Sequence, residues 1–323
     1  MASMREIKNR INSVNDTRKI TSAMYLIAST KMRKAKEGLD NTRPYFDALR
    51  REIRRIFSAK DDIENAYFYP HRGSHDLPGT YGYLVITADK GLAGAYNQSV
   101  IKEAMKLMSK HDDNKLFVVG EYGRHYFQAH NIEMEKSFLY TAQNPTLARA
   151  GEIAAELLDM YDKGELTKIF IIYTDLVNSM SSSVASSRLL PLSRGEFIEG
   201  EDEDGDGIID MPSTDFEFYP NMVRALDSII PSYLTGFIYS ALVDSFCSEQ
   251  NERMMAMDSA NKNAEKLLEE LSILYNHVRQ NAITQEITEV SSGAKAKRKK
   301  LELQKKKKKN YSVRDNQHKE NAI

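Results

Sequence analysis

The chain of 323 residues contains a single cysteine, Cys247. One thiol cannot form an intramolecular disulfide or a cysteine-rich zinc site, so neither can stabilise this fold. The sequence also lacks a run of about eighteen apolar residues, which a transmembrane helix would require. The first residues, Met1 to Ile7, lack the apolar region of a secretory signal. These absences predict a cytoplasmic protein and leave open a peripheral place in a membrane assembly.

Catalytic motifs are also missing. The 7 histidines show no HExxH or similar metal-ligand spacing, and the sequence contains no GxSxG turn. The turn Asp89–Asn97 follows a strand-like run and precedes a helical one, which is where α/β domains bind phosphates. Because it lacks the complete GxGxxG and GxxxxGK[ST] patterns, we favour a structural role, in which Gly91 and Gly94 permit a tight turn and close packing.

The net charge of −1 conceals strong charge segregation along the chain. Residues 1–55 hold 14 Lys and Arg against 6 Asp and Glu, and residues 295–309 hold 10 basic residues and one acidic residue. Residues 196–217 hold 10 acidic residues and no basic one. Basic patches suggest nucleic acid or membrane as a partner, or else a solvated helix face and a disordered tail.

Part of the acidic stretch resembles a calcium loop. Residues 202–210 match the first nine positions of an EF-hand loop, in which hard oxygen ligands suit Ca²⁺. The candidate ligands are Asp202, Asp204, Asp206, Ile208 and Asp210. Position twelve is Ser213 instead of a bidentate glutamate, and no flanking helices are predicted. The alternative is an acidic surface insertion over residues 196–217 that binds no metal.

Hydrophobic periodicity predicts a long helix over residues 222–296. Between Asn251 and Ala294 there is no proline, and Gly293 is the only glycine. Apolar residues recur at spacings of four and three, the heptad pattern of a coiled coil. This C-terminal seam comprises Ala264, Leu268, Leu271, Tyr275, Val278 and Ala282, and it shifts register to Ile283, Ile287 and Val290. A helix of this length would span roughly 100 Å, so it needs a partner.

The start of the chain, residues 1–57, supplies a second seam with the same spacing. This N-terminal seam comprises Ile7, Ile11, Val14, Arg18, Thr21, Tyr25, Ala28, Met32, Ala35 and Leu39. Proline at position 44 is predicted to interrupt the helix, because the residue before proline disfavours α geometry. The two seams together predict an antiparallel coiled coil. The alternative is an ordinary pair of helices packed on a core.

The middle of the chain, residues 58–221, alternates strand and helix signals. Strands are predicted over 81–87, 116–119 and 169–173, with 183–190 at an edge, and helices over 98–110, 124–129 and 146–161. This alternation predicts a central Rossmann-like α/β domain with a largely parallel sheet. The predicted fold class is therefore α/β plus a long antiparallel coiled coil of paired N- and C-terminal helices. A self-repelling, disordered basic tail follows over residues 297–323.

Nearly all of residues 4–296 resembles the γ subunit family of F-type ATP synthases. The matching stretches are 7–14, 17–24, 28–35, 89–94, 189–192, 248–257, 263–264, 275–287 and 292–294. The resemblance implies a non-catalytic rotor stalk without a cofactor, turning inside a hexamer of three α and three β subunits. Its foot would sit with the ε subunit on the membrane ring of c subunits, whose proton or sodium flow drives ATP synthesis at β.

The resemblance also implies rotor–stator contacts and a location. Met24 corresponds to a contact with β near the region of Arg253, and Lys31, Arg33 and Lys34 to residues facing the acidic lever loop of β. The positions that face the catch loops of the hexamer are Arg279, Gln280, Thr284 and Glu286. The alternative for these charges is a solvated helix face. The implied location is the cytoplasmic face of a bacterial cell membrane, since a single cysteine excludes the dithiol switch of chloroplast relatives.

Two other functions fit parts of the sequence. The basic first helix and tail fit a nucleic-acid-binding coiled-coil protein, whose affinity would depend strongly on salt. The glycine turn fits a nucleotide-binding α/β enzyme, which would bind ATP as an isolated chain. The resemblance predicts neither nucleic acid as a partner nor any membrane contact except through the complex. Because family members commonly end near Ala294, we expect the tail to be dispensable.

Overall fold

The computed structural model describes residues 3–59, 63–69, 77–178, 181–198 and 221–320. The chain divides into two compact units. Unit 1 combines the two ends of the chain, Met1–Thr21 and Ala260–Ile323. Unit 2 is Ser22–Ser259 and contains the α/β domain. The segments that the sequence analysis assigned to opposite ends of the chain therefore do come together.

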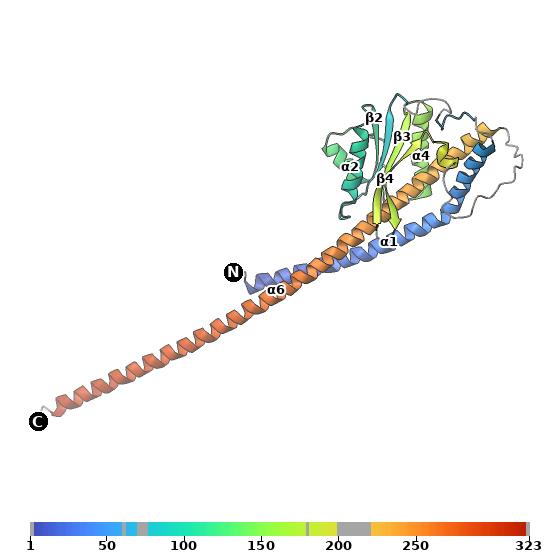
Figure 1. Ribbon diagram of the computed structural model, residues 1–323. Coiled ribbons are helices and arrows are strands. Elements are labelled where there is room, and N and C mark those ends of the chain that lie inside the picture. The colour runs from blue at the N-terminus through green and yellow to red at the C-terminus, as the bar shows by residue number, and fades with distance from the viewer. Residues whose placement is uncertain (1–2, 60–62, 70–76, 179–180, 199–220, 321–323) are drawn as a thin grey trace. The chain divides into compact units, whose positions relative to one another are not determined.

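Unit 2 is built on a four-stranded sheet in the order β2-β1-β3-β4 (Figure 1). The strands are β1 (Tyr81–Ile86), β2 (Asn114–Val119), β3 (Lys168–Asn178) and β4 (Ser181–Leu190). Strand β1 runs parallel to both of its neighbours, and β4 pairs antiparallel with β3 at the edge. The central Rossmann-like domain and the edge position of the last strand are confirmed, and the antiparallel direction of that strand is an additional finding.

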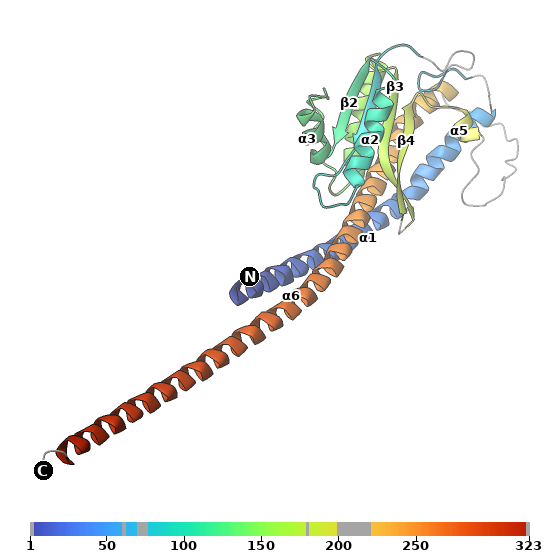
Figure 2. The ribbon, with the colours of Figure 1, turned by 60° about the vertical axis from the view of Figure 1, so that its left-hand side comes forward.

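Helices cover both faces of this sheet. Alternate residues of β1 point to opposite sides, so that Leu84 and Ile86 join one core and Tyr83 and Val85 the other. Helices α2 (Tyr96–Met108) and α3 (Glu121–Ala129) contribute to the second core (Figure 2). The first core lies under α4 (Leu147–Asp162) and the unit 2 parts of the two terminal helices, with the short α5 (Gly195–Ile198) at its margin. A strand buried on both faces explains why residues 81–86 are apolar with little alternation.

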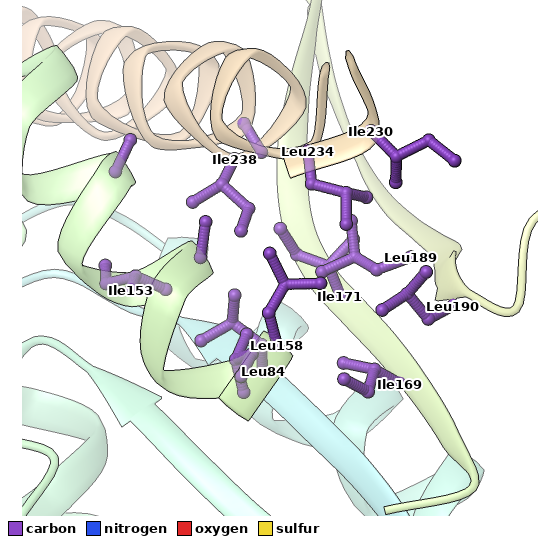
Figure 3. Close-up of a cluster of buried hydrophobic side chains, with 14 of the residues drawn as sticks. Leu84, Ile153, Leu158, Ile169, Ile171, Leu189, Leu190, Ile230, Leu234 and Ile238 are labelled. Carbon is purple, nitrogen blue, oxygen red and sulfur yellow. The ribbon is translucent and has the colours of Figure 1, made fainter. Parts of the chain in front are cut away.

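The larger core fixes the C-terminal helix to the sheet. Helix α6 (Met222–Glu320) presents Ile230, Leu234 and Ile238 to α4 and to the strands (Figure 3). Each of these side chains is almost fully buried, and burying one such side chain stabilises the fold by about 1.5–3 kcal/mol. By composition alone this part of α6 is apolar enough to cross a membrane, but half of that window is buried inside the protein. It has the character of a core helix.

Helix α1 (Met4–Ala59) does not stop at Pro44, so the predicted interruption was wrong. Proline removes one backbone hydrogen bond but leaves the remaining ladder intact. Beyond it, Ile53, Ile56 and Phe57 are completely buried in the larger core. Tertiary packing of this last stretch outweighs the local cost of the proline.

Unit 1 confirms its part of the predicted coiled-coil seam, whereas Tyr25, a predicted seam member in unit 2, is exposed. Ile7 and Leu271 are buried, and the other predicted members of unit 1 up to Ala282 are half-buried between exposed neighbours. Arg18 forms an ion pair with Glu265, and Thr21 is hydrogen-bonded to Asn261. Because rising numbers in α1 meet falling numbers in α6, the pair is antiparallel.

The helix continues where a disordered tail was predicted. Helix α6 extends beyond residue 296 to Glu320. Lys, Arg, Leu, Glu and Gln are good helix formers, and no glycine or proline follows Gly293. Extending an existing helix avoids the unfavourable nucleation step, which explains the difference. From Ile283 to Leu303 every described side chain is exposed, including the shifted seam residues Ile287 and Val290.

Candidate functional site

The predicted calcium loop lies outside the described residues, since 199–220 are not among them. Calcium binding at residues 202–210 therefore stays a prediction, and calorimetric titration of the whole chain with Ca²⁺ would test it. Within the described part of the chain, no group of three or more His, Cys, Asp or Glu side chains is placed to hold a metal ion.

The predicted rotor–stator residues of unit 2 lie on two helices. Lys31, Arg33 and Lys34 are exposed on α1, and Met24 is half-buried on the same helix. Arg253, on α6, is mostly enclosed and forms an ion pair with Glu249 at 2.6 Å. Burial raises the pKa of Glu249, while the positive charges of Arg253 and, more weakly, Lys31 counteract that rise. The structure thus brings Lys31 and Arg253 into the electrostatic reach of one buried carboxylate.

The remaining predicted contacts lie on α6 within unit 1. Arg279, Gln280, Thr284 and Glu286 are all exposed, and the Thr284 hydroxyl donates to the backbone carbonyl of Gln280 at 2.9 Å. Exposed apolar side chains at Ile283, Ile287 and Val290 alternate with them. A helix that exposes both kinds of side chain over several turns offers a surface to a surrounding partner.

The glycine turn between β1 and α2 packs directly on α6. A Cβ at Gly94, whose φ is +54°, would lie 2.9 Å from a carboxylate oxygen of Glu252. This confirms the predicted close packing at Gly94. Gly91 does not fit that explanation, because a Cβ there would meet nothing within 4 Å. The left-handed residue next to it is Leu92, with a φ of +64°.

The Asp89 carboxylate, at the start of the glycine turn, ties this turn to two other segments of the domain. The Asp89 carboxylate accepts hydrogen bonds from the backbone N–H of Glu121, at the start of α3, and from those of Ala142 and Gln143 at 3.0–3.2 Å. Free N–H groups at a helix start are what binds phosphate in α/β domains. Asp89 satisfies one such N–H group, that of Glu121 at the start of α3, whereas the glycine turn itself leads into α2.

Replacing Asp89 with alanine should destabilise unit 2 by about 2–3 kcal/mol, because the substitution leaves several N–H groups without their acceptor. Urea denaturation followed by circular dichroism would measure the loss. The isosteric control Asp112→Asn alters an exposed carboxylate in the loop before β2 and should change little. Equal stability of Asp89→Ala and the control would show that the carboxylate is not the organiser of these loops.

Sequence reasoning named Arg253 but missed its partner Glu249, and it also missed the roles of Asp89 and Leu92. Glu249 and Arg253 are four positions apart on a helix, a spacing that could have suggested their pairing. Asp89 follows a strand, which is a weak signal by itself. Nothing in the sequence indicates that Leu92, and not Gly91, adopts the left-handed conformation.

Comparisons with known proteins agree on one family. A family model described as ATP synthase matches residues 3–296. The ATP synthase gamma chain of Caldanaerobacter subterraneus subsp. tengcongensis is 40% identical over 292 residues, covering 90% of this chain and 98% of that one. The gamma chain of Ruminiclostridium cellulolyticum is 37% identical over 294 residues, covering 91% and 98%. The central stalk of the Tetrahymena thermophila mitochondrial ATP synthase shares the fold, with a TM-score of 0.52 and 22% identity over 75% of this chain and 99% of that one.

Proposed function

The chain belongs to the ATP synthase gamma family, and we propose that it acts as the non-catalytic central rotor stalk of an F-type ATP synthase. Its partners would be three α and three β subunits, the ε subunit and the c-ring. Ion flow through the membrane sector would turn the stalk, and the turning stalk would drive each β site through its nucleotide states. The c-ring would hold the chain peripherally at the cytoplasmic face of a bacterial membrane.

The observation that carries this proposal is the antiparallel pairing of the two chain ends in unit 1. A buried seam and continuous backbone hydrogen bonds make such a pair stiff, so that it can transmit torque. The exposed apolar and polar residues of α6 supply the surface that a surrounding hexamer would contact.

Co-expression with the α, β and ε subunits of the same source tests the proposal. We expect a stoichiometric complex that contains this chain and hydrolyses ATP. Salt-sensitive binding of DNA by the isolated chain, without complex formation, would favour the nucleic-acid alternative instead. Binding of ATP to the isolated chain would favour an α/β enzyme.

Charge reversal at Arg33 and Lys34 should lower coupled ATP synthesis by on the order of tenfold, because like charges would then face the acidic lever loop of β. Assembly of the complex should be affected less than synthesis. A double reversal at Lys102 and Lys110, two exposed lysines in and just after α2, controls for net charge. Unchanged coupling in the Arg33 and Lys34 variant would remove the contact role of this cluster.

Truncation after Ala296 should leave assembly and ATP synthesis unchanged, because the family match ends at residue 296 and the exposed helix beyond it contributes no buried contact up to Leu303. Complex yield and synthesis rate in membrane vesicles would measure this. A truncated chain that no longer assembled would refute the dispensability of the tail.

A further inference from the structure

A buried ion pair on α6 joins Arg253, one of the predicted rotor–stator residues, to Glu249. The Glu249 and Arg253 side chains are only 4% and 12% exposed, and they meet at 2.6 Å. Removing water from two charges costs free energy, which their mutual attraction offsets only in good geometry. A pair of this kind therefore indicates that the two side chains are needed in fixed positions, more than that the pair stabilises the fold.

The guanidinium of Arg253 has a second partner in another segment of unit 2. It donates to the backbone carbonyl of Gly91 at 3.0 Å. The planar guanidinium carries five N–H donors in a fixed arrangement, so holding one edge orients the others. Glu249 thereby aims Arg253 at the glycine turn. We call these three groups, the Glu249 carboxylate, the Arg253 guanidinium and the Gly91 carbonyl, the loop contact.

The segment held by the loop contact is under local strain. Leu92 combines a φ of +64° with an apolar side chain that is 67% exposed. A non-glycine residue keeps such a conformation only where its surroundings impose it. The neighbouring Gly94 lies against Glu252, and Arg253 holds Gly91, so α6 imposes the shape of the turn from both sides.

The loop contact also lies where the packing of α6 on the domain changes in character. Up to Cys247 the buried α6 residues of the large core are mostly apolar. Further along, the connections are polar: Ser182 of β4 donates to Glu252 at 3.3 Å, and Arg253 holds Gly91. Apolar burial is non-directional, whereas hydrogen bonds fix an orientation.

We propose that Glu249 is a positioning residue that acts through Arg253 and Gly91 to stop α6 from turning against the α/β domain. This inference rests on the proposed rotor function. A rotor driven at its domain must pass torque to its helices, and the loop contact adds a charge-assisted directional connection to the hydrogen bonds of Ser182 with Glu252 and of Thr174 with Ser245. Without it, ATP hydrolysis continues while less of the rotation is converted into ion transport.

The test uses the complete complex reconstituted into vesicles, with Glu249→Gln and Arg253→Gln in this chain. The readout is the ratio of ATP-driven ion pumping to ATP hydrolysis, because a purely structural defect lowers both rates together. We expect that ratio to fall by about fivefold in each variant, the equivalent of one lost hydrogen bond. The double variant should be no worse than either single one, since both act through the same contact.

Asp159→Asn, which breaks an exposed ion pair with Lys163 on α4, is the matched control and should leave the ratio unchanged. Arg253→Lys keeps the positive charge, but an ammonium group cannot reproduce the guanidinium's simultaneous contacts with Glu249 and Gly91. The ratio of pumping to hydrolysis should therefore lie between those of the unmodified chain and the glutamine variants. This variant keeps the test usable even if the glutamine variants assemble poorly. An unchanged ratio in Arg253→Lys and Glu249→Gln, or pumping and hydrolysis falling in parallel, would overturn the inference. Failure of the unmodified chain to assemble would count against the rotor function instead.

Discussion

Gly236→Ala is expected to destabilise unit 2 by about 1–3 kcal/mol, although alanine is the better helix former. The reason is the close approach of α1 and α6. A Cβ at Gly236 would overlap the ring of Phe46 on α1, including the ring atom nearest the backbone, so the ring cannot simply swing its far end away. Chemical denaturation of the whole chain would measure the loss.

A second helical glycine provides the control for Gly236. A Cβ at Gly151, on α4, would make only an ordinary contact of 3.8 Å with Thr235. Gly151→Ala should therefore stabilise the chain by about 0.5–1 kcal/mol through helix propensity alone. Adding Phe46→Leu to Gly236→Ala should recover part of the lost stability. If both glycine variants gained stability, the two helices would not be packed as closely as described.

Gly120→Ala should cost on the order of 3 kcal/mol or more, because two penalties combine. Gly120 joins β2 to α3 with a φ of +99°, a conformation that L residues rarely adopt. An added Cβ would also overlap the backbone carbonyl of Thr87 and lie 2.8 Å from that of Ala88. These are backbone atoms of a buried strand end, so they cannot move aside cheaply.

The matched control for Gly120 is Gly164, which separates strain from overlap. Gly164 has a φ of +75°, but a Cβ there would meet nothing within 4 Å. Gly164→Ala should therefore destabilise the chain only by the cost of holding an L residue at a positive φ, about 1–2 kcal/mol. Thermal denaturation of the two variants would give the difference. A similar loss at both positions would show that the strand end yields to the methyl group.

Much of this architecture could be predicted from the sequence because burial leaves a periodic signal. The spacing of Ile7, Ile11 and Val14 anticipated one seam, and that of Leu268, Leu271 and Tyr275 the other. The run at 81–87 predicted a strand, which the structure places at Tyr81–Ile86. Two predictions were wrong. The helix-breaking tendency of Pro44 was outweighed by the core packing of the residues that follow it. The charge repulsion expected to disorder the chain beyond residue 296 was outweighed by propagation of the existing helix.

The loop contact could not be predicted in the same way. It depends on where the chain brings the carbonyl of Gly91 relative to Arg253, and a backbone carbonyl has no sequence signature. The role of Asp89 is similar, since its acceptor oxygens serve N–H groups from two segments that are distant in sequence. Contacts between segments that carry no periodic pattern become visible only in three dimensions.

Rotation of this chain inside the assembled complex tests the central claim most directly. A probe attached to Lys102→Cys, an exposed position on α2, would report it, and the native Cys247 would not compete because it is buried. With the α and β subunits immobilised, the account predicts that ATP turns the probe in one direction, with dwells equal in number to the β subunits. A complex that hydrolyses ATP while the probe stays fixed or only fluctuates would contradict it.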